Sequence, residues 1–220
     1  MRKTSFVEGE FYHIYNRGVD KRNIFSDQND LQRFLQSILE FNTIEPIGSI
    51  YENSFIKNKL GNETSKSNEK LVDFIAYCIN PNHFHFILEP KTDTGLSDFM
   101  KRLSGGYTKY FNNKYDRTGS LFQGVFKSVL VSSNEQLLHL SAYVNLNNEV
   151  HQLGNETSKL VRSSMGEYLN ETKTGGICKR DIILDQFRNT EEYEKNARET
   201  VKEIIRKRKE DKELMKMLME

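Results

Sequence analysis

The stretch that decides the fold is Asn80-Pro81-Asn82-His83-Phe84-His85-Phe86-Ile87-Leu88, which follows another run of β-forming residues at 72–79. Asn-Pro-Asn is typical of a turn, so the two runs predict two strands joined directly. Alternate side chains of a strand lie on the same face. His83 and His85 should therefore project together, while Phe84 points into the core.

Two imidazoles side by side on a rigid strand can form a preformed pair of metal ligands. The alternative is a pair of surface histidines on an edge strand. A motif as short as His-x-His leaves both interpretations open.

Elsewhere in the chain, the spacing of apolar residues is typical of strands in some segments and of helices in others. It predicts strands at 11–16, 47–57 and within 121–131, a polar loop at 58–70, and helices from a cap at 26 or 27 to 39, at 95–113, 134–146, 182–187 and 190–220. The last helix holds nine basic and nine acidic residues, so we expect it to be solvated. The heptapeptide Leu-Gly-Asn-Glu-Thr-Ser-Lys occurs at 60–66 and again at 153–159, which indicates a duplication without an assigned role.

Tyr143 and Asn147 lie four residues apart in a predicted helix and therefore share a face. Beside two histidines, the phenol could act as a nucleophile and the amide oxygen as a third metal ligand, with the cation stabilising the developing charge. The alternative is that Tyr143 packs against the sheet and Asn147 caps the helix. Tyr107 is the rival nucleophile, but it continues the apolar stripe of the helix at 95–113, which favours packing.

Six basic residues and one acid lie between 101 and 130, a local charge of +5 interleaved with aromatic residues. Cations neutralise phosphates and aromatic rings stack on unpaired bases, a combination typical of single-stranded nucleic-acid binding. Together with the loop after the first strand, the candidate DNA-binding residues are Arg17, Lys21, Arg22, Lys101, Arg102, Lys109, Lys114, Arg117 and Lys127.

The composition of the chain narrows the possible classes of protein and its cellular compartment. The 220 residues carry 32 basic and 31 acidic side chains, a formal charge of +1, so the global charge does not indicate a nucleic-acid binder. No apolar run approaches the roughly 18 residues of a membrane span, and the start lacks the apolar segment of a secretory signal. Cys78 and Cys178 have no metal-type spacing, which favours a reduced, cytoplasmic compartment.

Across roughly residues 8–150 the chain resembles the tyrosine HUH transposases, most closely the REP-associated tyrosine transposases of the single-tyrosine group. The resemblance rests on Tyr-His-Ile-Tyr-Asn-Arg-Gly at 12–18, the histidine segment at 80–88, Tyr-Thr-Lys-Tyr-Phe-Asn at 107–112, Gly-Ser-Leu-Phe-Gln-Gly at 119–124 and Tyr-Val-Asn-Leu-Asn at 143–147, in the family's order. The chain departs from the family at Asn148, where proline is frequent.

The resemblance implies that His83, His85 and Asn147 bind Mg²⁺ or Mn²⁺. It implies that Tyr143 attacks a DNA phosphate, leaving a 5′-phosphotyrosine and a free 3′-hydroxyl. No nucleotide cofactor is implied, because the phosphotyrosine conserves the bond energy for rejoining. The implied substrate is single-stranded DNA beside a hairpin with a nearby guide sequence, and relatives act as monomers or homodimers.

The expected fold is α+β, with a central antiparallel sheet carrying the His-x-His strand and helices on one face. We expect residues 1–150 to form the catalytic domain and 151–220 a mostly helical extension. The expected function is that of a metal-dependent transposase that nicks and rejoins single-stranded DNA next to a hairpin. Two alternatives stay open: a domesticated hairpin-binding module that does not cut, and a histidine-based phosphoesterase, although a second His-x-Ser/Thr element is missing.

Overall fold

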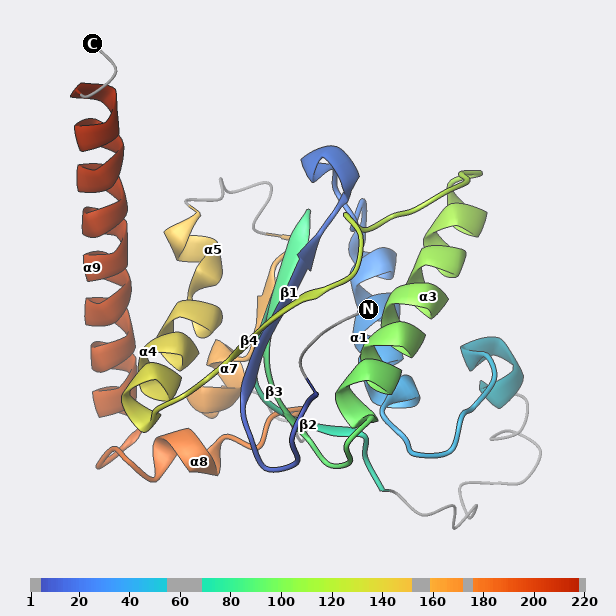
Figure 1. The fold of residues 1–220 in the computed structure, drawn as a ribbon, viewed down its shortest axis with the longest axis horizontal. Coiled ribbons are helices and arrows are strands. Elements are labelled where there is room, and N and C mark those ends of the chain that lie inside the picture. The colour runs from blue at the N-terminus through green and yellow to red at the C-terminus, as the bar shows by residue number, and fades with distance from the viewer. Residues whose placement is uncertain (1–4, 55–68, 152–158, 172–175, 218–220) are drawn as a thin grey trace.

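A five-stranded antiparallel sheet of order β4-β1-β3-β2-β5 forms the centre of the computed structural model (Figure 1). The model describes residues 5–54, 69–151, 159–171 and 176–217. The predicted loop at 58–70 and both copies of the heptapeptide lie outside these ranges, apart from residues 69, 70 and 159. The strands are β1 (Tyr12–Arg17), β2 (Val72–Asn80), β3 (His83–Pro90), β4 (Lys127–Leu130) and β5 (Arg162–Ser163).

Strand β3, which carries both histidines, lies in the middle of the sheet. Its antiparallel partner β2 places Asn80 opposite His83 across the turn, and β1 on its other side places Tyr15 opposite His85. The α+β class and the central position of the His-x-His strand are therefore confirmed.

The first face of the sheet is covered by α1 (Gln28–Phe41) and α3 (Gly95–Lys114). Phe84, Phe86 and Leu88 of β3 point into this layer and are fully buried there. The predicted alternation of the strand is confirmed, because Phe84 enters the core while the two histidines face the other way.

The second face is also covered by helices, so the expectation of helices on one face only is wrong. Here α4 (Asn134–Asn145) and α9 (Thr190–Met217) form the main layer, with the short helices α5 (Asn147–Val150), α7 (Met165–Tyr168) and α8 (Asp181–Leu184) beside them (Figure 1). The physical reason is that Ile75, Cys78 and Ile87 also point to this face and need apolar cover.

Two further expectations need correction. Residues 50–54 are helical rather than part of a strand at 47–57, because Ser49 and Glu52 form a reciprocal cap in which each side chain accepts the other's backbone N–H at 3.1 Å. The last helix is not wholly solvated, since Tyr193, Ala197 and Val201 recur every four residues and are buried against the second face. Within the described residues, no helix is long and apolar enough to cross a membrane.

A buried carboxylate joins the two helices of the first face. Asp30 lies in the first turn of α1 and is fully buried, and it accepts a hydrogen bond from the backbone N–H of Ser26 at 2.8 Å. Lys114 at the end of α3 donates to the same carboxylate at 2.7 Å, and the hydroxyl of Tyr115 donates at 2.8 Å. Lys114 therefore has a structural partner inside the fold.

Replacing Lys114 with methionine should lower the free energy of unfolding by about 3 kcal/mol, because Asp30 would keep its buried charge without a cation. Urea denaturation measures this loss. Lys109→Met, on the same helix but exposed, is the control and should change stability by less than about 0.5 kcal/mol. Equal effects of the two substitutions would show that the ion pair does not stabilise the fold.

Candidate active site

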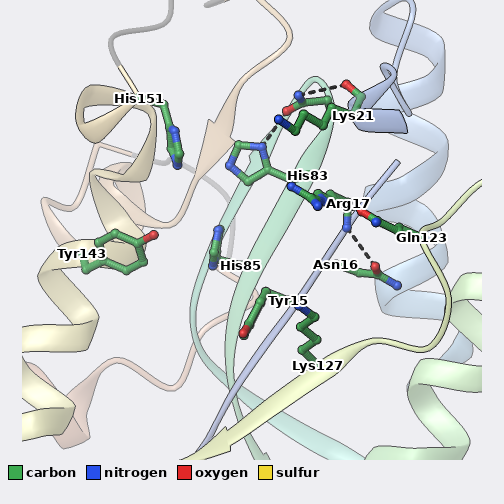
Figure 2. A pocket seen from close by; sticks show the side chains of 11 residues that line it. Tyr15, Asn16, Arg17, Lys21, His83, His85, Gln123, Lys127, Tyr143 and His151 are labelled. Atoms are coloured by element: carbon green, nitrogen blue, oxygen red, sulfur yellow. Dashed lines mark hydrogen bonds between the residues drawn. The ribbon is translucent and has the colours of Figure 1, made fainter. Parts of the chain in front are cut away.

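A pocket of about 660 Å³ opens beside the two histidines, where β1 ends and β3 begins (Figure 2). Its positive side chains are Arg17, Lys21 and Lys127, and no carboxylate is among the residues that line it. The lining residues are Tyr15, Asn16, Arg17, Lys21, Asn82, His83, His85, Gln123, Lys127, Tyr143 and His151. The charge of this pocket favours an anion as its ligand.

The turn before β3 fixes the His83 ring. Its Nδ1 lies 2.6 Å from Oδ1 of Asn82, and the amide oxygen can only accept, so Nδ1 carries the proton. The neutral ring then presents a lone pair at Nε2. Burial lowers the pKa of His83 to about 4, partly offset by its contact with Asn147, so the ring is neutral at pH 7.

Asn80, the last residue of β2, links His83 to Asn147. Its buried amide group Nδ2 donates to Oδ1 of Asn147 at 2.8 Å and to Nε2 of His83 at 3.0 Å. These two acceptor atoms lie 3.1 Å apart. Two lone pairs therefore face each other, and the two protons of one amide hold them in place.

His85 is oriented by a third histidine. Nδ1 of His85 lies 2.8 Å from Nε2 of His13 on β1, and the two rings stack. No described residue bonds Nε2 of His85, which leaves this nitrogen for a ligand. Burial, then the neighbouring His13 and His83, hold the pKa of His85 well below its usual value, and burial lowers that of His13 to about 4.

Tyr143 faces the histidines from α4. Its ring meets the His85 ring edge-on with centroids 5.5 Å apart, and Figure 2 shows its hydroxyl turned toward the histidines. The rival Tyr107 is fully buried and donates its hydroxyl to the backbone carbonyl of Ile24 at 2.7 Å. Burial also raises the pKa of Tyr107, so the prediction that this residue packs into the core is confirmed.

The expectation that one continuous helix carries Tyr143 and Asn147 is wrong. Helix α4 ends at Asn145, Leu146 leaves the helical conformation with a φ of −114° and a ψ of 24°, and Asn147 begins α5. Asn147 nevertheless reaches His83, because Asn80 at the end of β2 donates a hydrogen bond to its Oδ1 at 2.8 Å. The sheet rather than helical periodicity therefore positions Asn147.

The donor set fits a divalent cation. Among the described residues, no group of three or more His, Cys, Asp or Glu side chains could hold a metal ion, so a three-ligand site here would need a side chain of another type. The Oδ1 of Asn147 is such an oxygen, and its separation of 3.1 Å from Nε2 of His83 matches the roughly 3.0 Å between neighbouring ligands of an octahedral ion. The Nδ2 of Asn147 is buried without a partner.

The predicted DNA-binding residues fall into separate places. Arg17, Lys21 and Lys127 line the pocket. Arg22 and Arg117 line a different, smaller hollow, and Lys101 and Arg102 line a third. Arg102 donates to the backbone carbonyls of residues 43 and 44, Lys114 pairs with Asp27 and Asp30, and Lys109 is exposed on α3.

The sequence did not single out Asn80, Asn82, His13 or His151 as site residues. Three of the five histidines line this pocket, and His151 lies against His83 with ring centroids 4.8 Å apart. His13 lies behind them, with its ring stacked on that of His85. The pairing of β1 with β3 brings in His13, which alternation places on the same face as Tyr15. The alternation of β1 could therefore have indicated His13 from the sequence alone. The contacts of Asn80 could not be found in this way, because they depend on how α5 packs.

The chain combines an α+β fold, two histidines on the central strand of the sheet and a helical tyrosine beside them. This arrangement is similar to that of the tyrosine HUH transposases. Residues 49–147 match the family model described as "Transposase IS200 like". The recognition from sequence is therefore confirmed at the level of this transposase family, over the residues that contain His83, His85 and Tyr143.

Solved structures also resemble the chain, whereas no curated protein sequence matches it. One of these structures is described as "Structure of the REP associates tyrosine transposase bound to a REP hairpin". It is 11% identical to this chain with a TM-score of 0.48, and the match covers 81% of this chain and 93% of that one.

Replacing Asn80 with alanine should cost about 2–3 kcal/mol of unfolding free energy in metal-free buffer, because the lone pairs of His83 and Asn147 would lose their shared donor. Chemical denaturation in EDTA measures this change. Asn148→Ala, beside Asn147 on α5, is the control and should cost less than about 0.5 kcal/mol. An Asn80→Ala protein as stable as the parent would mean that the shared amide does not hold the site together.

Proposed function

We propose that this protein is a transposase that nicks and rejoins single-stranded DNA, with Tyr143 as its nucleophile and a divalent metal at His83, His85 and Asn147. The observation that carries the proposal is the pair of opposed lone pairs on His83 and Asn147, 3.1 Å apart, with a tyrosine beside them.

The metal proposed is Mg²⁺ or Mn²⁺, held by two neutral imidazoles and one amide oxygen. When bound, such an ion polarises a phosphate and stabilises charge that develops on it. Asn80 and His13 orient the ligands, which is the usual role of the groups behind a metal site. Burial keeps the imidazoles uncharged, so they do not need to lose a proton before binding.

In the proposed step, Oη of Tyr143 attacks a DNA phosphorus. The bond from phosphorus to the 3′ oxygen breaks, and a 5′-phosphotyrosine forms. The phenol loses one proton and the departing 3′ oxygen gains one, so no cofactor is consumed. Rejoining reverses the step, with a 3′-hydroxyl attacking the phosphotyrosine.

The proposed substrate is single-stranded DNA beside a hairpin, with a guide sequence nearby, and the protein acts as a monomer or a homodimer. The positive side chains of the pocket support a polyanionic substrate. Tyr15 adds an aromatic ring at the same wall, where an unpaired base could stack. The hairpin itself rests on the sequence resemblance.

Incubating the protein with Mn²⁺ and labelled hairpin DNA from the flanks of its gene should give a covalent adduct that survives denaturing electrophoresis. Tyr143→Phe should abolish the adduct, because it removes the attacking oxygen. Tyr107→Phe is the matched control and should retain it, while losing about 1 kcal/mol of stability with its hydrogen bond to Ile24.

An adduct that survives Tyr143→Phe would exclude Tyr143 as the nucleophile. Tight hairpin binding by the wild-type protein without any adduct would instead favour the non-catalytic binding module.

Asn147→Ala should weaken Mn²⁺ binding by at least tenfold, because a buried oxygen ligand is lost. Asn80→Ala should weaken it by about 10–100-fold through misplaced ligands. Isothermal titration calorimetry with the metal alone measures both, and Asn148→Ala is the control. Unchanged Mn²⁺ affinity in Asn147→Ala would show that the metal does not use this amide.

A further inference from the structure

The C-terminal helix α9 brings a positive side chain to the candidate nucleophile. Nη2 of Arg208 lies 3.4 Å from Oη of Tyr143 and can donate to it, and the guanidinium lies over the ring at 5.6 Å from its centroid. Arg208 is separated from Tyr143 by 65 residues, so only the packing of α9 on α4 brings them together.

The sequence of α9 explains why Arg208 points this way. Its buried face begins with Tyr193, Ala197 and Val201, and continues with the half-buried Ile204 and Ile205. Arg208 is four residues after Ile204, so it occupies the next position of that face. Tyr193 fixes the helix by accepting a hydrogen bond from the amide of Asn145 on α4 at 2.7 Å.

Neighbouring positive residues of α9 are neutralised within the helix, whereas Arg208 is not. Arg206 pairs with both Glu203 and Glu210, and Lys207 pairs with Glu203. Among the side chains that the structure describes, no carboxylate pairs with Arg208. Its guanidinium therefore lies beside the phenol oxygen and is not paired with a glutamate.

We propose that Arg208 binds the DNA phosphate that reacts with Tyr143, so that α9 completes the active site. The inference rests on the proposed function. Once Oη is bonded to phosphorus, the non-bridging oxygens lie two bonds from the atom that Arg208 already contacts. A planar guanidinium can donate to two of these oxygens at once, a geometry that suits phosphate better than a lysine ammonium does.

The first test is a binding measurement without metal, so it does not depend on cleavage. Fluorescence anisotropy in EDTA compares a single-stranded oligonucleotide that begins with a 5′-phosphate with the same oligonucleotide that begins with a 5′-hydroxyl. The wild-type protein should prefer the phosphate by about tenfold, the usual range for a charged hydrogen bond. Arg208→Gln should lose this preference, and Arg208→Lys should keep only part of it.

Arg206→Gln is the matched control, because it removes the same side chain from the same helix at a position already paired with glutamates. It should keep the phosphate preference. Equal behaviour of Arg208→Gln and Arg206→Gln, or no preference in the wild-type protein, would overturn the proposal.

The second test measures the rate of adduct formation in a single turnover at saturating hairpin DNA and Mn²⁺. Arg208→Gln should slow it by at least tenfold, with Arg206→Gln close to the wild-type rate. If the wild-type protein shows the phosphate preference but forms no adduct, the role of Arg208 in phosphate binding stands and the proposed nicking fails.

Discussion

The site depends on the burial of β3 on both of its faces. Because helices cover both faces of the sheet at this central strand, all its side chains are buried except that of His83, which is half-buried at the pocket. Phe84 and Phe86 fill the layer under α1 and α3, and the histidines are thereby forced into the layer under α4. The same burial that builds the core also removes the positive charge from the imidazoles and makes them suitable ligands.

Much of this arrangement could be predicted from local pattern. The turn at Asn80-Pro81-Asn82, the alternation of β3 and the apolar stripe of α3 depend on residues close in sequence, so the shared face of the two histidines and the packing of Tyr107 were predicted correctly. The helices on the second face were missed because residues after 150 supply part of that layer, and no short-range period shows where they pack. The basic residues of α3 do not gather with Arg17, Lys21 and Lys127 at the pocket, because α3 lies on the face opposite Tyr143.

The break after α4 shows why spacing alone misplaced Asn147. In a continuous helix, Asn147 would lie on the same face as Tyr143, four residues before it. The chain leaves the helix at Leu146 instead, although residue 148 is not a proline. The hydrogen bond from Asn80 to Oδ1 of Asn147 crosses this break and comes from the last residue of β2. A side chain of the sheet therefore ties the third candidate ligand in place, which helical spacing does not show.

Helix α9 illustrates how a balanced composition hides a position that contacts the candidate nucleophile. Nine basic and nine acidic residues made the segment from 190 onward resemble a solvated helix, yet a stripe with a spacing of three to four residues runs through it. Along such a helix a positive side chain is neutralised when a glutamate lies three or four residues away, as at Arg206. Arg208 has isoleucines at those positions on its N-terminal side and Asp211 three residues after it, yet its guanidinium contacts Tyr143 rather than a carboxylate among the described side chains.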